Sequence, residues 1–163
     1  MILYLGSSSL IKLYVREVDT DIIRGWVKAA EIVATCRIAY TEVVSALDVR
    51  LKKGDLSNSE HDLIVKQFAE DWQNIAKIDF DDREAGNLVR EYGLTRFGAL
   101  HLSAAKLILK EYRKHRIELE TTHKRRFDVD LFFFSADERL SRAAAAEGLK
   151  VPGLEVIAKN IGR

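Results

Sequence analysis

The sequence has very little cysteine or proline. Its 163 residues include one cysteine, Cys36, which excludes an internal disulfide and any zinc site built from several cysteines. The single proline, Pro152, leaves few enforced breaks in helices. No apolar run approaches the ~20 residues of a membrane-spanning helix, and the apolar start is too short for a signal peptide. We therefore expect a helix-rich cytoplasmic protein with no membrane partner.

Neither sign of charge dominates the chain. The 26 Lys and Arg residues face 25 Asp and Glu residues, which gives a formal net charge of +1 at pH 7. Overall charge therefore identifies no partner, and a nucleic-acid surface would need local clustering of basic residues. The hydrophobic content of 47% and charged content of 31% are typical of a globular protein. We expect one domain over residues 1–163.

Short apolar runs alternate with segments of helical periodicity. This alternation predicts an α/β domain with a central, mainly parallel β-sheet flanked by α-helices. The expected strands are 2–5, 32–35, 75–80 and 131–134, with a last edge strand near Val151. The expected helices begin near Leu10 and otherwise span about 19–30, 39–53, 57–72, 81–92, 95–108 and 137–147. Ile22, Ile23, Trp26 and Val27 are expected on the inner face of the helix at 19–30. At the helix ends, Gly54 is expected to stop a helix, Ser57 with Glu60 to form a capping box, and Asp81 or Asp82 to start a helix. Leu131–Phe134 is the most hydrophobic strand and is predicted to be central.

The chain opens with a strand that polar residues follow at once. Ile2–Leu5 is an unbroken apolar run, and Gly6–Ser9 can end the strand and cap a helix. Ligands of open parallel sheets bind beyond the carboxyl ends of the strands, so chemistry is expected first at Gly6–Ser9. The stretch MILYLGSSSLIKLYV resembles the opening of PIN-domain proteins, the nuclease family that includes VapC-type toxins. In that family a strand is followed by an aspartate, a Ser/Thr pair and a Leu/Val-rich helix.

The resemblance covers nearly the full length and implies a PIN-like domain with four acidic positions. PIN domains gather about four carboxylates that hold Mg²⁺ or Mn²⁺, and the ion activates water against an RNA phosphodiester. The first position is Gly6 here, and the second, in AYTEVVSAL, is Glu42. The third, in FGALHLSAA, is Gly98, where the family pattern D-A-L-H-L-A-A has aspartate. The fourth, in FFFSADERL, is Asp137, with Ser135 matching the family's T/S-x-D-x-x-L.

The first two positions also have ordinary structural interpretations. Gly6 can serve a strand-to-helix turn in which glycine supplies a positive φ, and without the family this interpretation is preferred. Glu42 can be a solvated acid in a first helical turn, where negative charge suits the helix dipole. It is, however, the lone acid among apolar neighbours, which favours a ligand role.

Of the last two positions, Asp137 has an ordinary structural interpretation and Gly98 has none. Counted from Thr95 as N-cap, Gly98 is at N3, where glycine costs roughly 0.5–1 kcal/mol. No local feature requires glycine there, so Gly98 is interpreted as a position that has lost its aspartate. His101, one turn on, is interpreted as a packed helix residue because no second His or Cys lies at metal-binding spacing. Asp137 can cap the next helix and act as a metal ligand at the same time. Asp128 and Asp130 lie at the other end of the strand, so they are not counted as ligands.

Two of the four expected carboxylates remain, Glu42 and Asp137. With the hydroxyls of Ser7, Ser8 and Ser135 they would hold a hydrated Mg²⁺ or Mn²⁺ weakly, but water activation depends on the full ligand geometry. We therefore expect an inactive or severely impaired nuclease. Two origins are compatible with the sequence. Either aspartate was replaced by glycine at both positions, by design or by selection against a toxic activity, or the chain is naturally degenerate. The rest of the motif is intact, which favours replacement. The resemblance also implies an RNA substrate, a small antitoxin partner and a homodimer.

A basic segment between about residues 110 and 126 departs from a compact PIN core and is expected to be an insertion. Seven Lys and Arg residues there face three Glu, a net charge of +4. Such a patch can contact RNA phosphates with an affinity that falls as salt rises. Alone, it is better explained as a solvated helix end and loop. The candidate RNA-binding residues are Arg113, Lys114, Arg116, Lys124, Arg125 and Arg126.

Two other functions are compatible with the sequence. One is a non-catalytic PIN domain that binds RNA or a protein, and it predicts salt-sensitive RNA binding without a divalent ion. The other sets the resemblance aside and places a phosphate group on the backbone N–H groups of Gly6–Ser9 at a helix N-terminus. The second signal is weak because neither a G-x-x-x-x-G-K-[ST] nor a G-x-G-x-x-G pattern is present.

Overall fold

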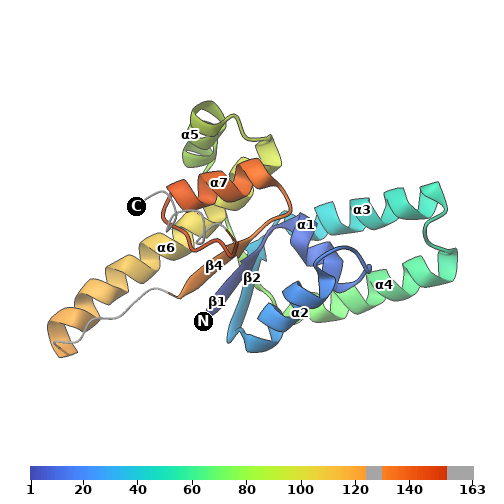
Figure 1. Ribbon diagram of the computed structural model, residues 1–163, viewed down its shortest axis with the longest axis horizontal. Helices are drawn as coiled ribbons and strands as arrows, with labels where there is room; N and C mark the ends of the chain where they lie inside the picture. The colour runs from blue at the N-terminus through green and yellow to red at the C-terminus, as the bar shows by residue number, and fades with distance from the viewer. Residues whose placement is uncertain (124–129, 154–163) are drawn as a thin grey trace.

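A four-stranded parallel sheet, in the order β3-β2-β1-β4, lies at the centre of the described part of the chain (Figure 1). The computed structural model describes residues 1–123 and 130–153. The strands are β1 (Ile2–Leu5), β2 (Ile32–Cys36), β3 (Ala76–Ile78) and β4 (Leu131–Phe134). Ile2 is in register with Ile32 on one side and with Leu131 on the other. The predicted α/β class and parallel sheet are confirmed.

The prediction that Leu131–Phe134 is the central strand was wrong. Strand β1 is hydrogen-bonded to both β2 and β4, whereas β4 lies at the end of the strand order and makes an isolated bridge from Phe132 to Lys150. That bridge stands in place of the edge strand predicted near Val151. The hydrophobicity of β4 is explained by aromatic packing, since the ring centroids of Phe132 and Phe134 lie 4.8 and 5.3 Å from Trp26.

The helices end and begin largely at the residues that can cap them. They are α1 (Ser7–Leu10), η1 (Ile11–Leu13), α2 (Thr20–Ala29), α3 (Ala39–Lys53), α4 (Asn58–Asp71), η2 (Trp72–Asn74), α5 (Asp82–Tyr92), α6 (Arg96–His123) and α7 (Glu138–Ala146). The predicted capping box is present: Glu60 N donates to Ser57 Oγ at 3.2 Å, and Ser57 N donates to Glu60 Oε2 at 2.7 Å. Gly54 ends α3 with φ 82°.

The helices cover both faces of the sheet (Figure 1). Successive side chains of a strand point to opposite faces, so Tyr4 packs with α5, α6 and α7 while Leu3 and Leu5 pack with α1 to α4. The first core includes Leu88, Leu102, Phe133, Leu140 and Ala144, and the second includes Leu10, Ile23, Val43, Leu47 and Phe68. The two cores hold the ends of the strands in fixed positions.

Three local predictions are corrected by the structure. The first helix begins at Ser7 rather than near Leu10, so the serines lie inside it. Ile22, predicted on the inner face of α2, is 55% exposed. The helix predicted to end near residue 108 continues as α6 as far as His123, because the chain has no proline or glycine there to end it.

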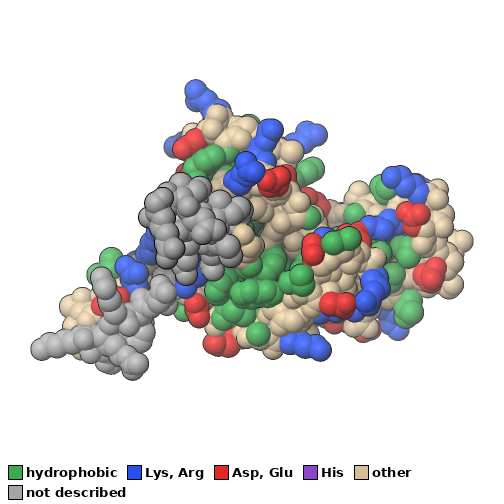
Figure 2. Space-filling model, viewed as in Figure 1, with side chains coloured by type: hydrophobic (Ala, Val, Ile, Leu, Met, Phe, Trp, Pro, Cys, Tyr) green, Lys and Arg blue, Asp and Glu red, His purple; other side chains and the backbone are tan. Residues whose placement is uncertain are grey.

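The described surface carries both signs of charge. Basic and acidic side chains are intermixed over the face shown in Figure 2, with hydrophobic side chains gathered near its middle. Among the described residues, every helix is too short or too polar to cross a membrane.

Candidate functional site

The four positions implied by the sequence lie around the carboxyl ends of the strands. Gly6 follows β1, and its N–H donates to the carbonyl of Phe134 at the end of β4 at 2.8 Å. Asp137 follows β4 and caps α7. Glu42 is in the first turn of α3, which follows β2, and Gly98 is in the first turn of α6. The parallel sheet brings these segments to one edge, as parallel sheets do at their binding sites.

Glu42 belongs to a hydrogen-bonded cluster of four side chains, Tyr4, Ser7, Glu42 and His101. Ser7 Oγ donates to Glu42 Oε1 at 2.7 Å, and His101 Nε2 lies 2.8 Å from both Ser7 Oγ and Glu42 Oε1. On the other side of the ring, Tyr4 OH lies 3.0 Å from His101 Nδ1. Tyr4 is fully buried and His101 is 3% exposed. The cluster joins β1, α1, α3 and α6 at a single point.

The bonding pattern assigns a role to each group. His101 Nε2 faces Glu42 Oε1 and His101 Nδ1 faces the Tyr4 hydroxyl, so each ring nitrogen has a hydrogen-bond partner. Burial raises the pKa of Tyr4 well above its ordinary value, so the phenol keeps its proton. Burial also raises the pKa of Glu42, but hydrogen bonds from His101 and Ser7 outweigh it, and the pKa lies below 4.5 overall. Glu42 is therefore an ionised carboxylate at neutral pH.

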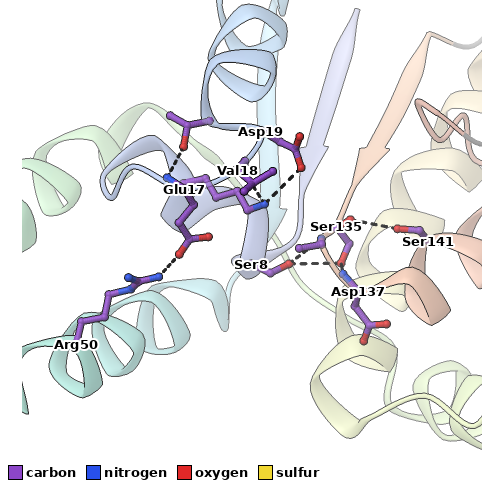
Figure 3. Close-up of polar contacts among 11 residues, drawn as sticks. Ser8, Glu17, Val18, Asp19, Arg50, Ser135, Asp137 and Ser141 are labelled. Atoms are coloured by element: carbon purple, nitrogen blue, oxygen red, sulfur yellow. Dashed lines mark hydrogen bonds and ion pairs between the residues drawn. The ribbon is translucent and has the colours of Figure 1, made fainter. Parts of the chain in front are cut away.

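A second polar cluster holds the loop between β4 and α7 against α1 (Figure 3). The Ala136 N–H donates to Ser8 Oγ at 3.0 Å, and the Asp137 N–H donates to Ser135 Oγ at 3.1 Å. Asp137 Oδ1 accepts from Leu140 N at 3.1 Å, which confirms its role as N-cap. The Asp137 side chain is exposed. Ser8 and Ser135 thus shape the loop that presents Asp137.

Gly6 does not have the positive φ that its turn interpretation predicted. Its φ of −67° and ψ of 158° are ordinary extended values. A Cβ added there would lie 3.4 Å from the Phe134 carbonyl oxygen and 3.6 Å from Ser135 Oγ, both van der Waals contacts. Two of the donors that the phosphate hypothesis needs are already used, because the Ser9 N–H donates to the Gly6 carbonyl and the Gly6 N–H donates to the Phe134 carbonyl. The backbone does not require glycine at position 6.

Gly98 is also free of backbone strain. It is the third residue of α6, and its N–H donates to Thr95 Oγ1 at 3.1 Å, as the sequence predicted. A Cβ added there would lie 3.1 Å from Thr95 Oγ1 and 3.7 Å from Leu140 Cδ2. The exposed Thr95 must yield by a few tenths of an ångström. Leu140 is the residue whose N–H is capped by Asp137, so position 98 faces the start of α7.

The acidic side chains of the candidate site are used within the fold, and the described residues include no group that could hold Mg²⁺ or Mn²⁺. Among residues 1–123 and 130–153, no three His, Cys, Asp or Glu side chains are grouped so as to hold one ion. One oxygen of Glu42 accepts from Ser7 and His101, and one oxygen of Asp137 accepts from the α7 backbone. Mg²⁺ demands near-octahedral oxygen ligands.

Of the basic residues predicted for RNA binding, Arg113, Lys114 and Arg116 lie on α6 away from this cluster. Arg113 and Lys114 are exposed on α6, and Arg116 lies 3.6 Å from Glu120. At the rise of an α-helix, Arg113 is ~22 Å along α6 from Gly98. Lys124, Arg125 and Arg126 lie outside the described residues. Any RNA contact by the described part of the segment would be remote from the candidate site.

His101 and Tyr4 are the site members that sequence reasoning missed. His101 is a buried residue of α6, as expected, but its ring is also hydrogen-bonded to Glu42. The signal was a histidine on the apolar side of a helix, since Ala99, Leu102 and Ala105 are buried beside it. A buried histidine needs partners for both ring nitrogens, and Glu42 was a candidate partner.

Comparison of the chain with models of known protein families gives no match, and comparison with curated proteins gives none either.

Proposed function

We propose that this chain is a VapC-like PIN-domain protein, the scaffold of a metal-dependent endoribonuclease that is inactive or impaired because Gly6 and Gly98 replace two ligand aspartates. One observation carries the proposal. The two glycines lie with Glu42 and Asp137 around one edge of the parallel sheet, in backbone conformations that do not call for glycine. Two glycines that the backbone conformation does not require, at two of four expected acidic positions, point to lost carboxylates.

Aspartates at positions 6 and 98 would complete a set of acidic side chains around this edge. Hard cations such as Mg²⁺ and Mn²⁺ require anionic oxygen ligands, and four carboxylates would supply them. Glu42 already has the required charge, because Ser7 and His101 hold its pKa below 4.5. Its geometry is also fixed, since it is bonded to side chains of two other elements. When bound, the metal would activate water against an RNA phosphodiester.

The remaining parts of the proposal follow from the family. The substrate is RNA, the protein partner is a small antitoxin, the chain forms a homodimer, and the compartment is the cytoplasm. Ile22 on α2 is 55% exposed and Leu63 on α4 is 68% exposed, so both side chains are accessible to such a partner.

The test restores the carboxylates. The Gly6→Asp, Gly98→Asp double variant is expected to cleave RNA with Mg²⁺ or Mn²⁺ and to lose this activity in EDTA, whereas the present chain does not cut. The matched control is Gly6→Asn, Gly98→Asn, which has nearly the same shape but no charge, and it is expected to be inactive. If the aspartate variant is folded by circular dichroism and cleaves neither structured nor single-stranded RNA, the catalytic proposal is wrong.

A naturally degenerate, non-catalytic PIN domain that binds RNA or a protein is the second candidate. It is favoured by the lack of a metal-binding group among the described residues and by the use of the remaining acidic side chains within the fold. Ser7 and His101 bind Glu42, and Asp137 caps α7. This candidate predicts that the present chain and the aspartate variant bind RNA equally, without metal, and that affinity falls as salt rises.

A further inference from the structure

An aromatic side chain stands exposed beside the candidate site. Phe97 is 48% exposed although phenylalanine is a residue that usually packs inside. The exposed guanidinium of Arg96 lies over its ring, with Cζ 5.6 Å from the ring centroid. An arginine over an aromatic ring is held by a cation–π interaction. The pair therefore forms a flat, positively charged feature on the surface.

The position of this pair relates it to the Glu42 cluster. Phe97 directly precedes Gly98, and it lies four residues before His101 in α6. Residues four apart share one face of an α-helix, so the Phe97 ring stands one turn N-terminal to the His101 ring. His101 is buried and bonded to Glu42 at 2.8 Å. Phe97 is therefore at the rim of the site, on the same face of the helix as the cluster.

The surroundings of Phe97 carry further positive charge. Arg139 Nη1 donates to the carbonyl of Gly93 at 2.9 Å, which holds its guanidinium against the loop that leads into α6. Arg96 follows that loop, so two arginines lie around the start of α6. A strand of RNA that reaches the site past this helix end would meet the Arg139 guanidinium for a phosphate and the Arg96–Phe97 pair for a base.

We propose that Phe97 and Arg96 hold an unpaired nucleobase of RNA next to the site. The inference rests on the proposed function, because it names the part of the RNA that the site would contact. A base stacks on an aromatic ring with little regard to sequence, since every base has a π-face. Bases inside a duplex are already stacked on one another, so the pair selects single-stranded RNA. The Phe97 ring is a positioning residue that fixes the strand beside Glu42.

The test measures binding of a short fluorescent RNA by anisotropy to the full chain and to Phe97→Leu. Phe97→Leu is expected to weaken binding of single-stranded RNA about tenfold. Phe97→Trp is expected to retain it, and Val49→Ala, which trims an exposed apolar side chain on α3, is the matched control. A strand of the same length made of ribose phosphate without bases is expected to bind the full chain and Phe97→Leu equally.

The outcomes separate this inference from the function on which it rests. Two results would show that Phe97 does not hold a base while RNA binding itself stands. Phe97→Leu would bind single-stranded RNA as tightly as the unsubstituted chain does, or its affinity for the strand without bases would fall as much as its affinity for RNA. If neither the full chain nor the Gly6→Asp, Gly98→Asp variant binds any RNA, the proposed function fails together with the inference.

Discussion

Replacement of His101 by phenylalanine tests whether the buried cluster stabilises the fold. The ring of His101 is 3% exposed, and it bonds to Glu42, Ser7 and Tyr4. Phenylalanine keeps a planar ring in the same place and removes both nitrogens. The substitution therefore removes hydrogen bonds with little change in packing.

The structure sets the size of the effect. Without His101 the fully buried Tyr4 hydroxyl loses the partner at 3.0 Å, and an unsatisfied buried hydroxyl costs about 1–3 kcal/mol. Glu42 keeps the Ser7 bond, and its side chain is 22% exposed, so water replaces part of what is lost and this bond contributes about 1 kcal/mol. We expect His101→Phe to lower the free energy of unfolding by about 2–4 kcal/mol.

Urea unfolding followed by tryptophan fluorescence measures this change. A double-mutant cycle with Tyr4→Phe then isolates the Tyr4–His101 interaction, because the double variant leaves no orphaned hydroxyl at this contact. The double variant is expected to lose about 1–2 kcal/mol less unfolding free energy than the two single variants lose together. A loss below about 0.5 kcal/mol for His101→Phe, which is typical of surface positions, would refute the reasoning that the cluster is a stabilising contact.

Two further predictions concern pH and backbone conformation. The pKa of Glu42 in the folded state lies below its ordinary value of 4.5, so its stabilising contribution is present above pH 4.5 and is lost as pH falls through the folded-state pKa. Glu42→Gln is therefore expected to lower the free energy of unfolding at pH 7 and to approach the stability of the unsubstituted chain in acid; parallel pH profiles by urea titration would contradict this. Gly86→Ala, in open space within α5, is expected to raise the free energy of unfolding by about 0.5–1 kcal/mol. Gly54→Ala, at φ 82°, is expected to lower it by about 1 kcal/mol or more, and thermal melts of the pair check the contrast.

The caps of the helices show what local sequence specifies. Ser57 with Glu60, Asp81 and Gly54 were predicted at helix ends, and each lies there. A cap requires a side chain or a glycine within a few residues of the helix end, so its signal is contained in a short stretch. Alternating strand and helix patterns likewise predicted the parallel sheet that the structure has.

Strand order and side-chain orientation depended on contacts between distant parts of the chain. The hydrophobicity of β4 predicted a central position in the sheet. In the structure Trp26 of α2 packs on Phe132 and Phe134, so this edge strand is as apolar as a central strand would be. Ile22 fits a buried helical stripe by spacing, but it is 55% exposed, because the width of the buried stripe depends on what packs against the helix.

The candidate site divides along the same line. The sequence by itself determined its residue types: short polar segments after apolar strands, with Glu42 and Asp137 acidic and Gly6 and Gly98 without a side chain. Only the tertiary structure decided that Glu42 is held by His101, 59 residues later, and that His101 is held by Tyr4, 97 residues earlier. The physical reason is that a hydrogen bond needs atoms within about 3 Å, and the parallel sheet with its two helical layers brings these side chains to that distance.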